Sequence, residues 1–351
     1  MKSKVKKLID IINLALDKQP TPLTLMEVCG SHTAALAKNG IPELFRGKIQ
    51  FLSGPGCPVC VTPTAYIDRL IELSHTPDHT VVTFGDLIRV PGSYGTLAES
   101  KSRGGNVQMV YSPFDVLHLA KSKPQINFVV AAIGFETTSP LYALLLDEII
   151  SEDIKNIKFL TSLKTMPKVI DELLKDNQTI DGIIAPGHVS VIIGSDAFSP
   201  IAKKYQLPFA VAGFESESLL TAIACLVKLK NQSRVINAYP SVVRPQGNYQ
   251  AQKMIDQYFD QNDAFWRGLG KINGSGLVIK PKWSSYDLGS ANLTDDQPEN
   301  KFCRCPDVLR GKMSPKDCPL FKTTCSPENP QGACMVSEEG SCHTFYNYYA
   351  D

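Results

Sequence analysis

Short apolar runs recur along the first two-thirds of the chain, and between several of them apolar residues return every three or four positions. Ile67, Leu70 and Ile71 keep one face of such a stretch, as do the apolar residues of 169–174. Continuous apolar strands with amphipathic helices between them are typical of parallel sheets that are covered on both faces. The pattern therefore predicts an α/β fold. The predicted strands are Leu23–Val28, Ile49–Leu52, Thr80–Phe84, Val107–Val110, Phe128–Ile133, Lys158–Thr161, Gly182–Ala185 and Phe209–Ala212.

The pattern changes after about residue 246, where strand signals thin out and Gly, Pro, Asn and Cys become frequent. The segment Phe265–Gly270 reads as packing plus a turn. We expect two parallel-sheet α/β domains, at residues 1–124 and 125–245, followed by a loop-rich domain at 246–351. This last domain is too poor in core residues to be stable without a cross-link.

Composition describes an ordinary globular chain of 351 residues, with 43% hydrophobic residues, 20% charged residues and a net charge of +1. Near-neutrality argues against nucleic acid or an anionic membrane as the main partner. The longest apolar runs are strand-sized, well short of the roughly 20 residues that span a bilayer. The basic start of the chain reads as an amphipathic helix, because Asp10 and Asn13 interrupt its apolar part. We expect a cytoplasmic protein.

The ten cysteines are unevenly spread. A cytoplasmic chain has little use for structural disulfides, so clustered cysteines favour metal or redox chemistry. Three lie in the first sixty residues, Cys225 stands alone, and six lie between Cys303 and Cys342.

Glycine-bearing loops with reactive side chains follow five of the predicted strands. Each loop on its own is explained by a turn that needs glycine and a helix cap. Together they suggest one composite cleft, because ligands bind at the carboxyl ends of strands in open α/β sheets. The candidate side chains are Cys29, His32, Cys57, Cys60, Asp86, Glu136, Thr137 and His188.

Two of these loops carry thiols in informative arrangements. Cys57 and Cys60 form a CxxC motif before a predicted helix, an arrangement that favours dithiol–disulfide exchange. The alternative, half of a zinc knuckle, is less favoured because the chain has no second CxxC to complete it. Cys29 lies three residues before His32. Such a pair is a nucleophile with its base or two metal ligands, unless the cysteine is a small buried hydrophobe.

The six C-terminal cysteines show no zinc-ribbon knuckles. Irregularly spaced thiolates in a loop-rich domain suit an iron–sulfur cluster. A cluster needs four ligands, and the spacing alone does not choose four of the six. They are Cys303, Cys305, Cys318, Cys325, Cys334 and Cys342.

Seven motifs follow one another along nearly the whole chain: MEVCGSHT (26–33), SGPGCPVCVTP (53–63), TFGDLIRVPGS (83–93), AIGFETT (132–138), IAPGHVSVIIG (184–194), WRGLG (266–270) and the cysteine-bearing block 303–342. In this order they resemble the HypD family of hydrogenase maturation proteins. The resemblance implies a scaffold for the Fe(CN)2CO group of [NiFe]-hydrogenases, which works with the partners HypC and HypE, the latter delivering cyanide. It also implies a [4Fe–4S] cluster in the C-terminal domain, and we expect a monomer within a heteromeric complex.

The resemblance also assigns roles to individual cysteines. The family's cluster spacing, C-x14-C-x6-C-x16-C, matches Cys303, Cys318, Cys325 and Cys342, and leaves two cysteines over. Cys29 matches the cysteine that holds the iron together with a cysteine of HypC. The CxxC pair matches the family's redox pair.

These observations favour a redox-active assembly scaffold over a conventional enzyme. The cluster would supply electrons singly, and the CxxC pair would store two. Hydrogen-bond donors of the cleft would stabilise the cyanide nitrogens. One alternative is a cluster-linked protein disulfide reductase resembling ferredoxin–thioredoxin reductase, which leaves Cys29 and His32 without a role. Another is a binding module whose cluster is only structural.

Overall fold

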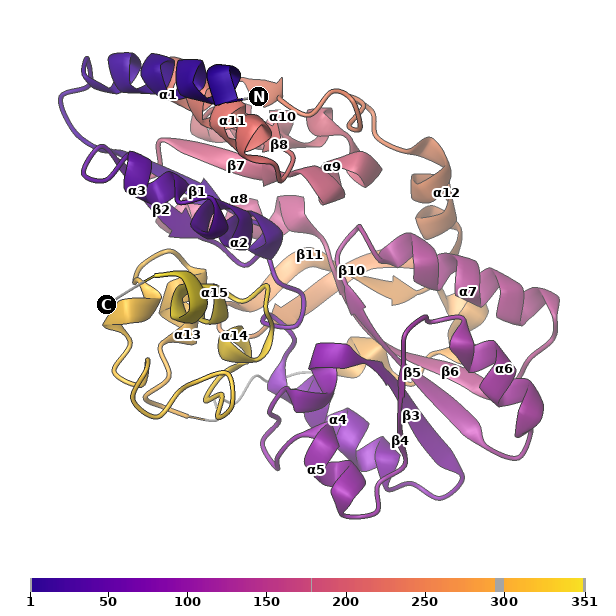
Figure 1. Cartoon of the computed structure of the whole chain (residues 1–351). Helices are drawn as coiled ribbons and strands as arrows, with labels where there is room; N and C mark the ends of the chain where they lie inside the picture. The colour runs from indigo at the N-terminus through magenta and orange to yellow at the C-terminus, as the bar shows by residue number, and fades with distance from the viewer. Residues whose placement is uncertain (1, 178, 294–299, 350–351) are drawn as a thin grey trace.

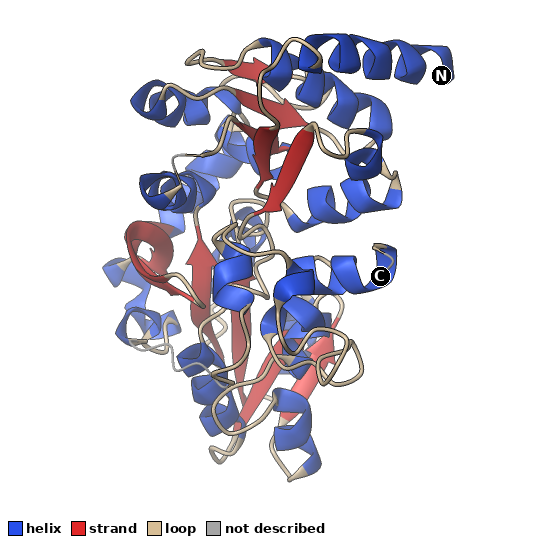
Figure 2. Cartoon of the chain, turned by 90° about the vertical axis from the view of Figure 1, so that its left-hand side faces the viewer, coloured by secondary structure: helices blue, strands red, loops and turns tan. Residues whose placement is uncertain are grey.

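The computed structural model describes residues 2–177, 179–293 and 300–349. Two β-sheets lie one above the other, and helices cover their faces (Figures 1 and 2). The first sheet is entirely parallel and has the strand order β2-β1-β7-β8-β9. Its strands are β1 (Leu23–Glu27), β2 (Ile49–Ser53), β7 (Gly182–Pro186), β8 (Phe209–Ala212) and β9 (Val235–Asn237).

The second sheet is mixed and has the order β10-β11-β6-β5-β3-β4. Four parallel strands form its body, and the hairpin β10–β11 adds to the edge of β6 in antiparallel pairing. Its strands are β3 (His79–Phe84), β4 (Val107–Val110), β5 (Asn127–Gly134), β6 (Ile157–Lys164), β10 (Phe259–Trp266) and β11 (Gly270–Ile279).

All eight predicted strands are present, and the α/β class is confirmed. Sheet membership does not follow chain order, however. The chain leaves the first sheet after β2, returns to it at β7, and enters the second sheet again at β10. Residues 1–124 and residues 125–245 therefore each contribute strands to both sheets, and the predicted ranges do not coincide with the two sheets.

The hairpin β10–β11 corrects the prediction that loops replace strands after residue 246. The predicted turn within Phe265–Gly270 is confirmed, because it joins the two strands of this hairpin. Its first strand contains the polar run Asp260–Asp263, and its second contains Gly270, Gly274 and Gly276. Such residues have low strand propensity, so the signal in the sequence is weak. Pairing with the edge of β6, at Leu163 and Lys164, extends the sheet through them.

Helices of the α/β body cover apolar strands that carry the core. α1 packs on α11 above the first sheet, and α12 packs on α7 beside the second (Figure 1). The helices are α1 (Lys2–Leu16), α2 (Gly30–Lys38), α3 (Ile41–Leu44), α4 (Thr64–Ser74), α5 (Leu97–Ser102), α6 (Asp115–Ser122), α7 (Ser139–Ser151), α8 (Met166–Asp176), α9 (Gly187–Ile193), α10 (Ser199–Tyr205), α11 (Ser216–Lys228) and α12 (Tyr249–Tyr258), with 3-10 turns η1 (Gly85–Arg89), η2 (Ser195–Phe198), η3 (Pro281–Tyr286) and η4 (Ser290–Asn292).

Residues 300–349 form a compact segment of short helices and loops beside both sheets (Figure 1). The helix α15 contacts α2 of the first sheet, and the carbonyl of Val336 accepts a hydrogen bond from Arg89, which follows β3 of the second sheet. Its elements are α13 (Cys305–Leu309), η5 (Pro315–Asp317), α14 (Ala333–Val336) and α15 (Ser341–Tyr348). The segment therefore holds the two sheets to a common third body.

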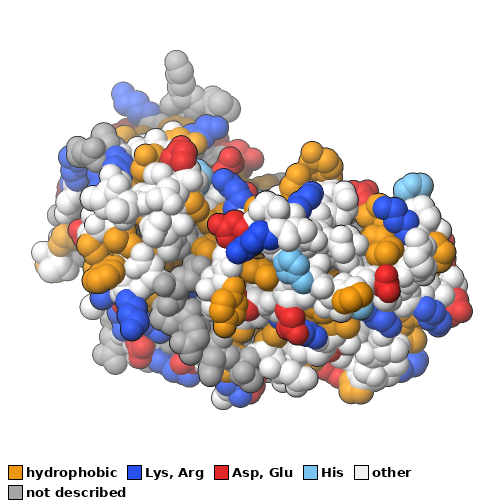
Figure 3. Space-filling view, turned by 90° about the horizontal axis from the view of Figure 1, so that it is seen from below, with side chains coloured by type: hydrophobic (Ala, Val, Ile, Leu, Met, Phe, Trp, Pro, Cys, Tyr) orange, Lys and Arg blue, Asp and Glu red, His pale blue; other side chains and the backbone are white. Residues whose placement is uncertain are grey.

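The surface shows charges of both signs intermixed on the face seen from below (Figure 3), in keeping with a net charge of +1. Within the described residues, no helix combines the length and the apolar character needed to cross a membrane.

Candidate functional site

Each sheet has one point at which the strand order reverses. In the first sheet it lies between β1 and β7, and in the second between β3 and β5. Ligands of open α/β sheets bind at such points, beyond the carboxyl ends of the strands. Cys29 and His188 follow the first pair of strands, while Asp86 and Glu136 follow the second pair. The predicted residues thus divide between two switch points.

Cys29 is the residue that caps the N-terminus of α2, and only 8% of it is exposed. Burial raises the pKa of its thiol to about 12, against the opposing effect of the backbone N–H groups of His32 and Ser31. The thiolate is therefore disfavoured until a cation or a metal replaces the proton.

Glu27, at the end of β1, organises the turn around Cys29. One carboxylate oxygen accepts the Cys29 N–H at 2.9 Å, and the other accepts the hydroxyl of Thr33. The side chain is buried, which raises the pKa of its carboxyl to about 7. Glu27 was not among the predicted site residues, although an acid at the end of the apolar run Leu23–Val28 is the signal that marks it.

Two glycines allow other segments to close on Cys29. A Cβ on Gly56 would lie 2.2 Å from the Cα of Cys29, so the CPVC loop packs directly against it. A Cβ on Gly30 would lie 2.2 Å from the carbonyl oxygen of Glu339, and the Ser31 hydroxyl donates to the Glu339 carboxylate at 2.7 Å. The structure therefore brings Cys29 together with the CPVC loop and the C-terminal segment.

His32 is fully buried, and burial lowers its pKa to about 4. Its Nε2 lies 3.2 Å from the carbonyl oxygen of Ala212 and 3.1 Å from that of Gly213. The ring of Phe214 contacts both imidazoles, with its centroid 4.8 Å from that of His32 and 4.1 Å from that of His188. His32 and exposed His188 therefore belong to one aromatic stack beside α2.

Cys57 and Cys60 are both buried free thiols. The Cys60 N–H donates to Sγ of Cys57 at 3.2 Å, so the pair lies within one tight turn. Burial raises the pKa of Cys60 well above its ordinary value, and its side chain hydrogen-bonds that of Cys334. The CPVC pair thus contacts the C-terminal cysteines directly.

All six C-terminal cysteines line one small cavity, with Leu320, Phe321 and Met335 as apolar neighbours. The N–H of Gln331 donates to Sγ of Cys325 at 3.4 Å. A Cβ on Gly332 would lie 2.7 Å from Sγ of Cys303, so a glycine is needed for that approach. In residues 2–177, 179–293 and 300–349, no three His, Cys, Asp or Glu side chains converge as ligands of a single metal ion.

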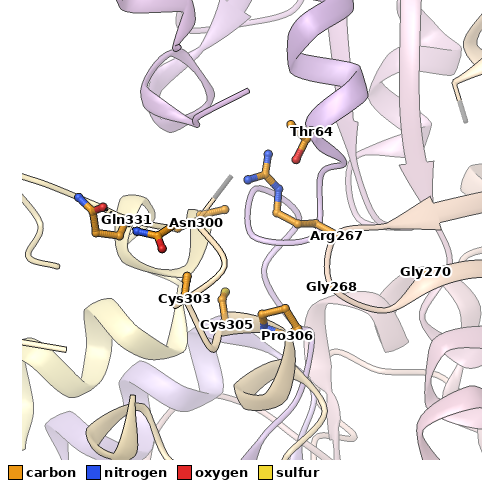
Figure 4. A pocket seen from close by; sticks show the side chains of 11 residues that line it. Thr64, Arg267, Gly268, Gly270, Asn300, Cys303, Cys305, Pro306 and Gln331 are labelled. Carbon is orange, nitrogen blue, oxygen red and sulfur yellow. Dashed lines mark hydrogen bonds between the residues drawn. The ribbon is translucent and has the colours of Figure 1, made fainter. Parts of the chain in front are cut away.

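Arg267 is a second residue that sequence reasoning missed. It follows β10, and its guanidinium donates to the carbonyls of Thr62 and Pro91, each at 2.7 Å. Its N–H also donates to the carbonyl of Val61. Arg267 lies across an open pocket from Cys303 and Cys305 (Figure 4). It therefore fixes the loop after the CPVC pair to the loop after β3.

The remaining predicted residues lie around the second switch point. Glu136 is buried, accepts the N–H of Met166 at the start of α8 at 2.9 Å, and burial raises the pKa of its carboxyl to about 7. Thr137 is half-buried in the same loop. Asp86 pairs with Arg89 at 3.5 Å, and Arg89 reaches the C-terminal segment. Among the residues that the structure describes, no hydrogen bond or ion pair joins Asp86, Glu136 or Thr137 to Cys29 or His32. The role of these three residues in one composite cleft stays a prediction.

Comparison with known proteins identifies the family. Residues 3–349 match the HypD family model, described as the "Hydrogenase formation hypA family". The chain is 42% identical to the hydrogenase maturation factor HypD of Escherichia coli K12, over 93% of this chain and 89% of that protein. It is 39% identical to a putative hydrogenase expression/formation protein of Methanocaldococcus jannaschii, over 98% and 97% of the two chains. The chain therefore belongs to the HypD family of hydrogenase maturation factors.

Proposed function

We propose that this protein is the scaffold on which the Fe(CN)2CO group of a [NiFe]-hydrogenase is assembled, together with HypC and with HypE as the cyanide donor. The observation that carries the proposal is a continuous line of cysteines. Cys29 packs on the CPVC loop through Gly56, and Cys60 contacts Cys334, which lines the six-cysteine cavity. An iron-holding thiol is thereby connected to redox-capable thiols, as such an assembly reaction requires.

Iron is the cargo, and Cys29 is its ligand from this chain. Soft thiolates suit an iron that also carries CO and cyanide. The buried thiol holds its proton at neutral pH, so binding of iron must replace that proton and release it to solvent. The N–H groups of Ser31 and His32 then face a sulfur that carries negative charge.

The C-terminal cavity fits a resident [4Fe–4S] cluster. Each cysteine of such a cluster binds a different iron, so its ligands surround a space rather than converge on one point. When bound, the cluster supplies electrons one at a time. The N–H of Gln331 would stabilise charge on Cys325, and Gly332 leaves room for Cys303. We assign the cluster to Cys303, Cys318, Cys325 and Cys342.

Cys57 and Cys60 would hold two electrons. Their oxidation to a disulfide releases two protons and two electrons, and the tight CPVC turn already places the Cys60 N–H 3.2 Å from the partner sulfur. Thiol labelling with mass spectrometry should find the pair bridged after mild oxidation and free after reduction. Stoichiometric zinc on both thiols of the purified protein would contradict this role.

Infrared spectroscopy of the protein purified anaerobically with HypC tests the central claim. Bands from iron-bound cyanide and CO are expected in the wild type and absent in Cys29→Ser, because serine is a harder and less acidic donor. Cys225→Ser, on α11 away from the cavity, is the matched control and should keep the bands. Full bands in Cys29→Ser, or disulfide turnover without HypC and iron, would overturn the assignment.

The cluster assignment has its own test. Cys→Ala at any of the four assigned ligands should remove iron and the broad visible absorption, and should destabilise the segment that depends on the metal. Cys305→Ala and Cys334→Ala are the matched controls, since both cysteines line the same cavity. Loss of the cluster's visible absorption in Cys305→Ala or Cys334→Ala, together with its retention in Cys303→Ala, would show that the assignment is wrong.

A further inference from the structure

The imidazole of His32 is fixed in one tautomer by its surroundings. Its Nε2 faces two carbonyl oxygens, of Ala212 and Gly213, at 3.2 and 3.1 Å. Carbonyl oxygens only accept hydrogen bonds, so Nε2 carries the ring proton. Nδ1 therefore presents a lone pair. The one N–H of the ring is already engaged by the two carbonyls, so it is not available as a donor to another group.

That lone pair is buried, and it has no hydrogen-bond partner among the residues that the structure describes. An unsatisfied buried polar atom costs roughly 1–3 kcal/mol, so its presence calls for an explanation. A histidine whose ring N–H donates to backbone carbonyls while its other nitrogen stays free has the arrangement of a metal ligand. The stack against Phe214 further limits rotation of the ring.

His32 also lies where the cargo must lie. Cys29 caps α2, and His32 is the third residue of the helix, so the two are three residues apart on one face of its first turn. Helical side chains lean toward the N-terminus of their helix, which carries His32 toward Cys29.

We propose that Nδ1 of His32 is a second ligand, from this chain, of the iron that Cys29 holds. The inference rests on the proposed function. Low-spin iron(II) takes six ligands, while two cyanides, one CO and two thiolates supply five. Imidazole is a suitable donor for iron, and a neutral ligand adds no further negative charge to an already anionic group.

The variant His32→Gln separates the two roles of the imidazole, as a metal ligand through Nδ1 and as a hydrogen-bond donor through Nε2. A glutamine places an N–H near the position of Nε2, where it still meets the two carbonyls, but it has nothing in place of Nδ1. The probe is one equivalent of cobalt(II), added anaerobically to the complex of the cluster-containing chain with HypC. We expect His32→Gln to bind cobalt at least tenfold more weakly than the wild type. His118→Gln, an exposed histidine on α6, should bind it normally.

Spectroscopy and cobalt affinity together decide whether Nδ1 of His32 is a ligand. X-ray absorption of the cobalt-loaded wild type should show scattering from an imidazole ring that disappears in His32→Gln, and the CO band of the iron-loaded complex should move to higher wavenumber in the variant. Unchanged cobalt affinity in His32→Gln, with loss in Cys29→Ser, refutes this inference alone. Unchanged affinity in Cys29→Ser refutes the proposed iron site itself. If His32→Gln does not fold, absence of the imidazole signal from the wild type still refutes the ligand.

Discussion

Arg267 offers a quantitative test of how the CPVC loop is held. Replacing it with methionine keeps the aliphatic stem but removes two hydrogen bonds of 2.7 Å, to the carbonyls of Thr62 and Pro91. Hydrogen bonds to charged groups contribute roughly 1.5–3 kcal/mol each. Because Arg267 is half-buried, the lower end of that range applies, and the two bonds together contribute about 3 kcal/mol. The loss falls on the loop that follows Cys60.

Thiol labelling under native conditions measures this loss. A local destabilisation of about 3 kcal/mol raises the population of the open loop roughly a hundredfold, since about 1.4 kcal/mol corresponds to a factor of ten. Alkylation of Cys57 and Cys60 should accelerate by up to that factor in Arg267→Met. Arg46→Met removes an exposed ion pair with Glu43, worth about 0–1 kcal/mol, and serves as the control. Equal labelling rates in the two variants would refute the proposed clamp.

Two further predictions concern Glu136 and Gly332. Burial raises the pKa of Glu136 to about 7 from an ordinary 4.5. Between pH 4.5 and pH 7 the folded protein therefore holds a proton on this carboxyl that the unfolded chain releases, and the wild type loses stability as the pH rises through this range. Glutamine cannot ionise, so Glu136→Gln should lose less free energy of unfolding than the wild type between pH 5 and pH 8. Urea unfolding at several pH values measures this difference, and identical pH dependence of the two proteins would argue against the raised pKa of Glu136. Gly332→Ala should displace Sγ of Cys303 and lower the iron content. Gly85→Ala is the control and should keep the iron, because the position of its added Cβ is open space. Equal iron in both variants would show that Cys303 does not need the close approach.

Most strands of the parallel bodies were predictable because they are short runs rich in apolar residues, several of which end at a glycine-bearing loop. The strand β9 was not predicted, because its three residues are too short a signal. Leu23–Glu27 and Gly182–Pro186 are examples of the predicted strands, and both lie within a residue of their expected bounds. The pairing of these two strands was not predictable, because more than 150 residues separate them and apolar runs of similar composition compete for every neighbour. Local pattern identifies a buried strand, but it does not identify the sheet to which the strand belongs.

The candidate site follows the same division. The thiols of the CPVC pair and of the C-terminal segment could be predicted as chemical groups from residue type and spacing alone. Their direct contact, through Cys60 and Cys334, depends on long-range packing. Arg267 escaped notice because its guanidinium binds backbone carbonyls of two distant loops, and sequence shows no hydrogen-bond partners. Glu27 escaped notice because one of its partners is the backbone N–H of Cys29, which leaves no mark in the sequence.

The interleaving of the two sheets bears on how the chain acquires its structure during synthesis. The β1 edge of the pair β1–β2 stays open until β7 leaves the ribosome, more than 120 residues after β2. The second sheet is not complete until β11 has been made. Domains usually fold as units from the N-terminus while translation proceeds. In this protein neither sheet is a finished N-terminal unit, so Cys29 acquires its surroundings only after most of the chain has been translated. We therefore expect that metal is acquired by the completed polypeptide, and that nascent chains shorter than about 280 residues do not form this thiol environment.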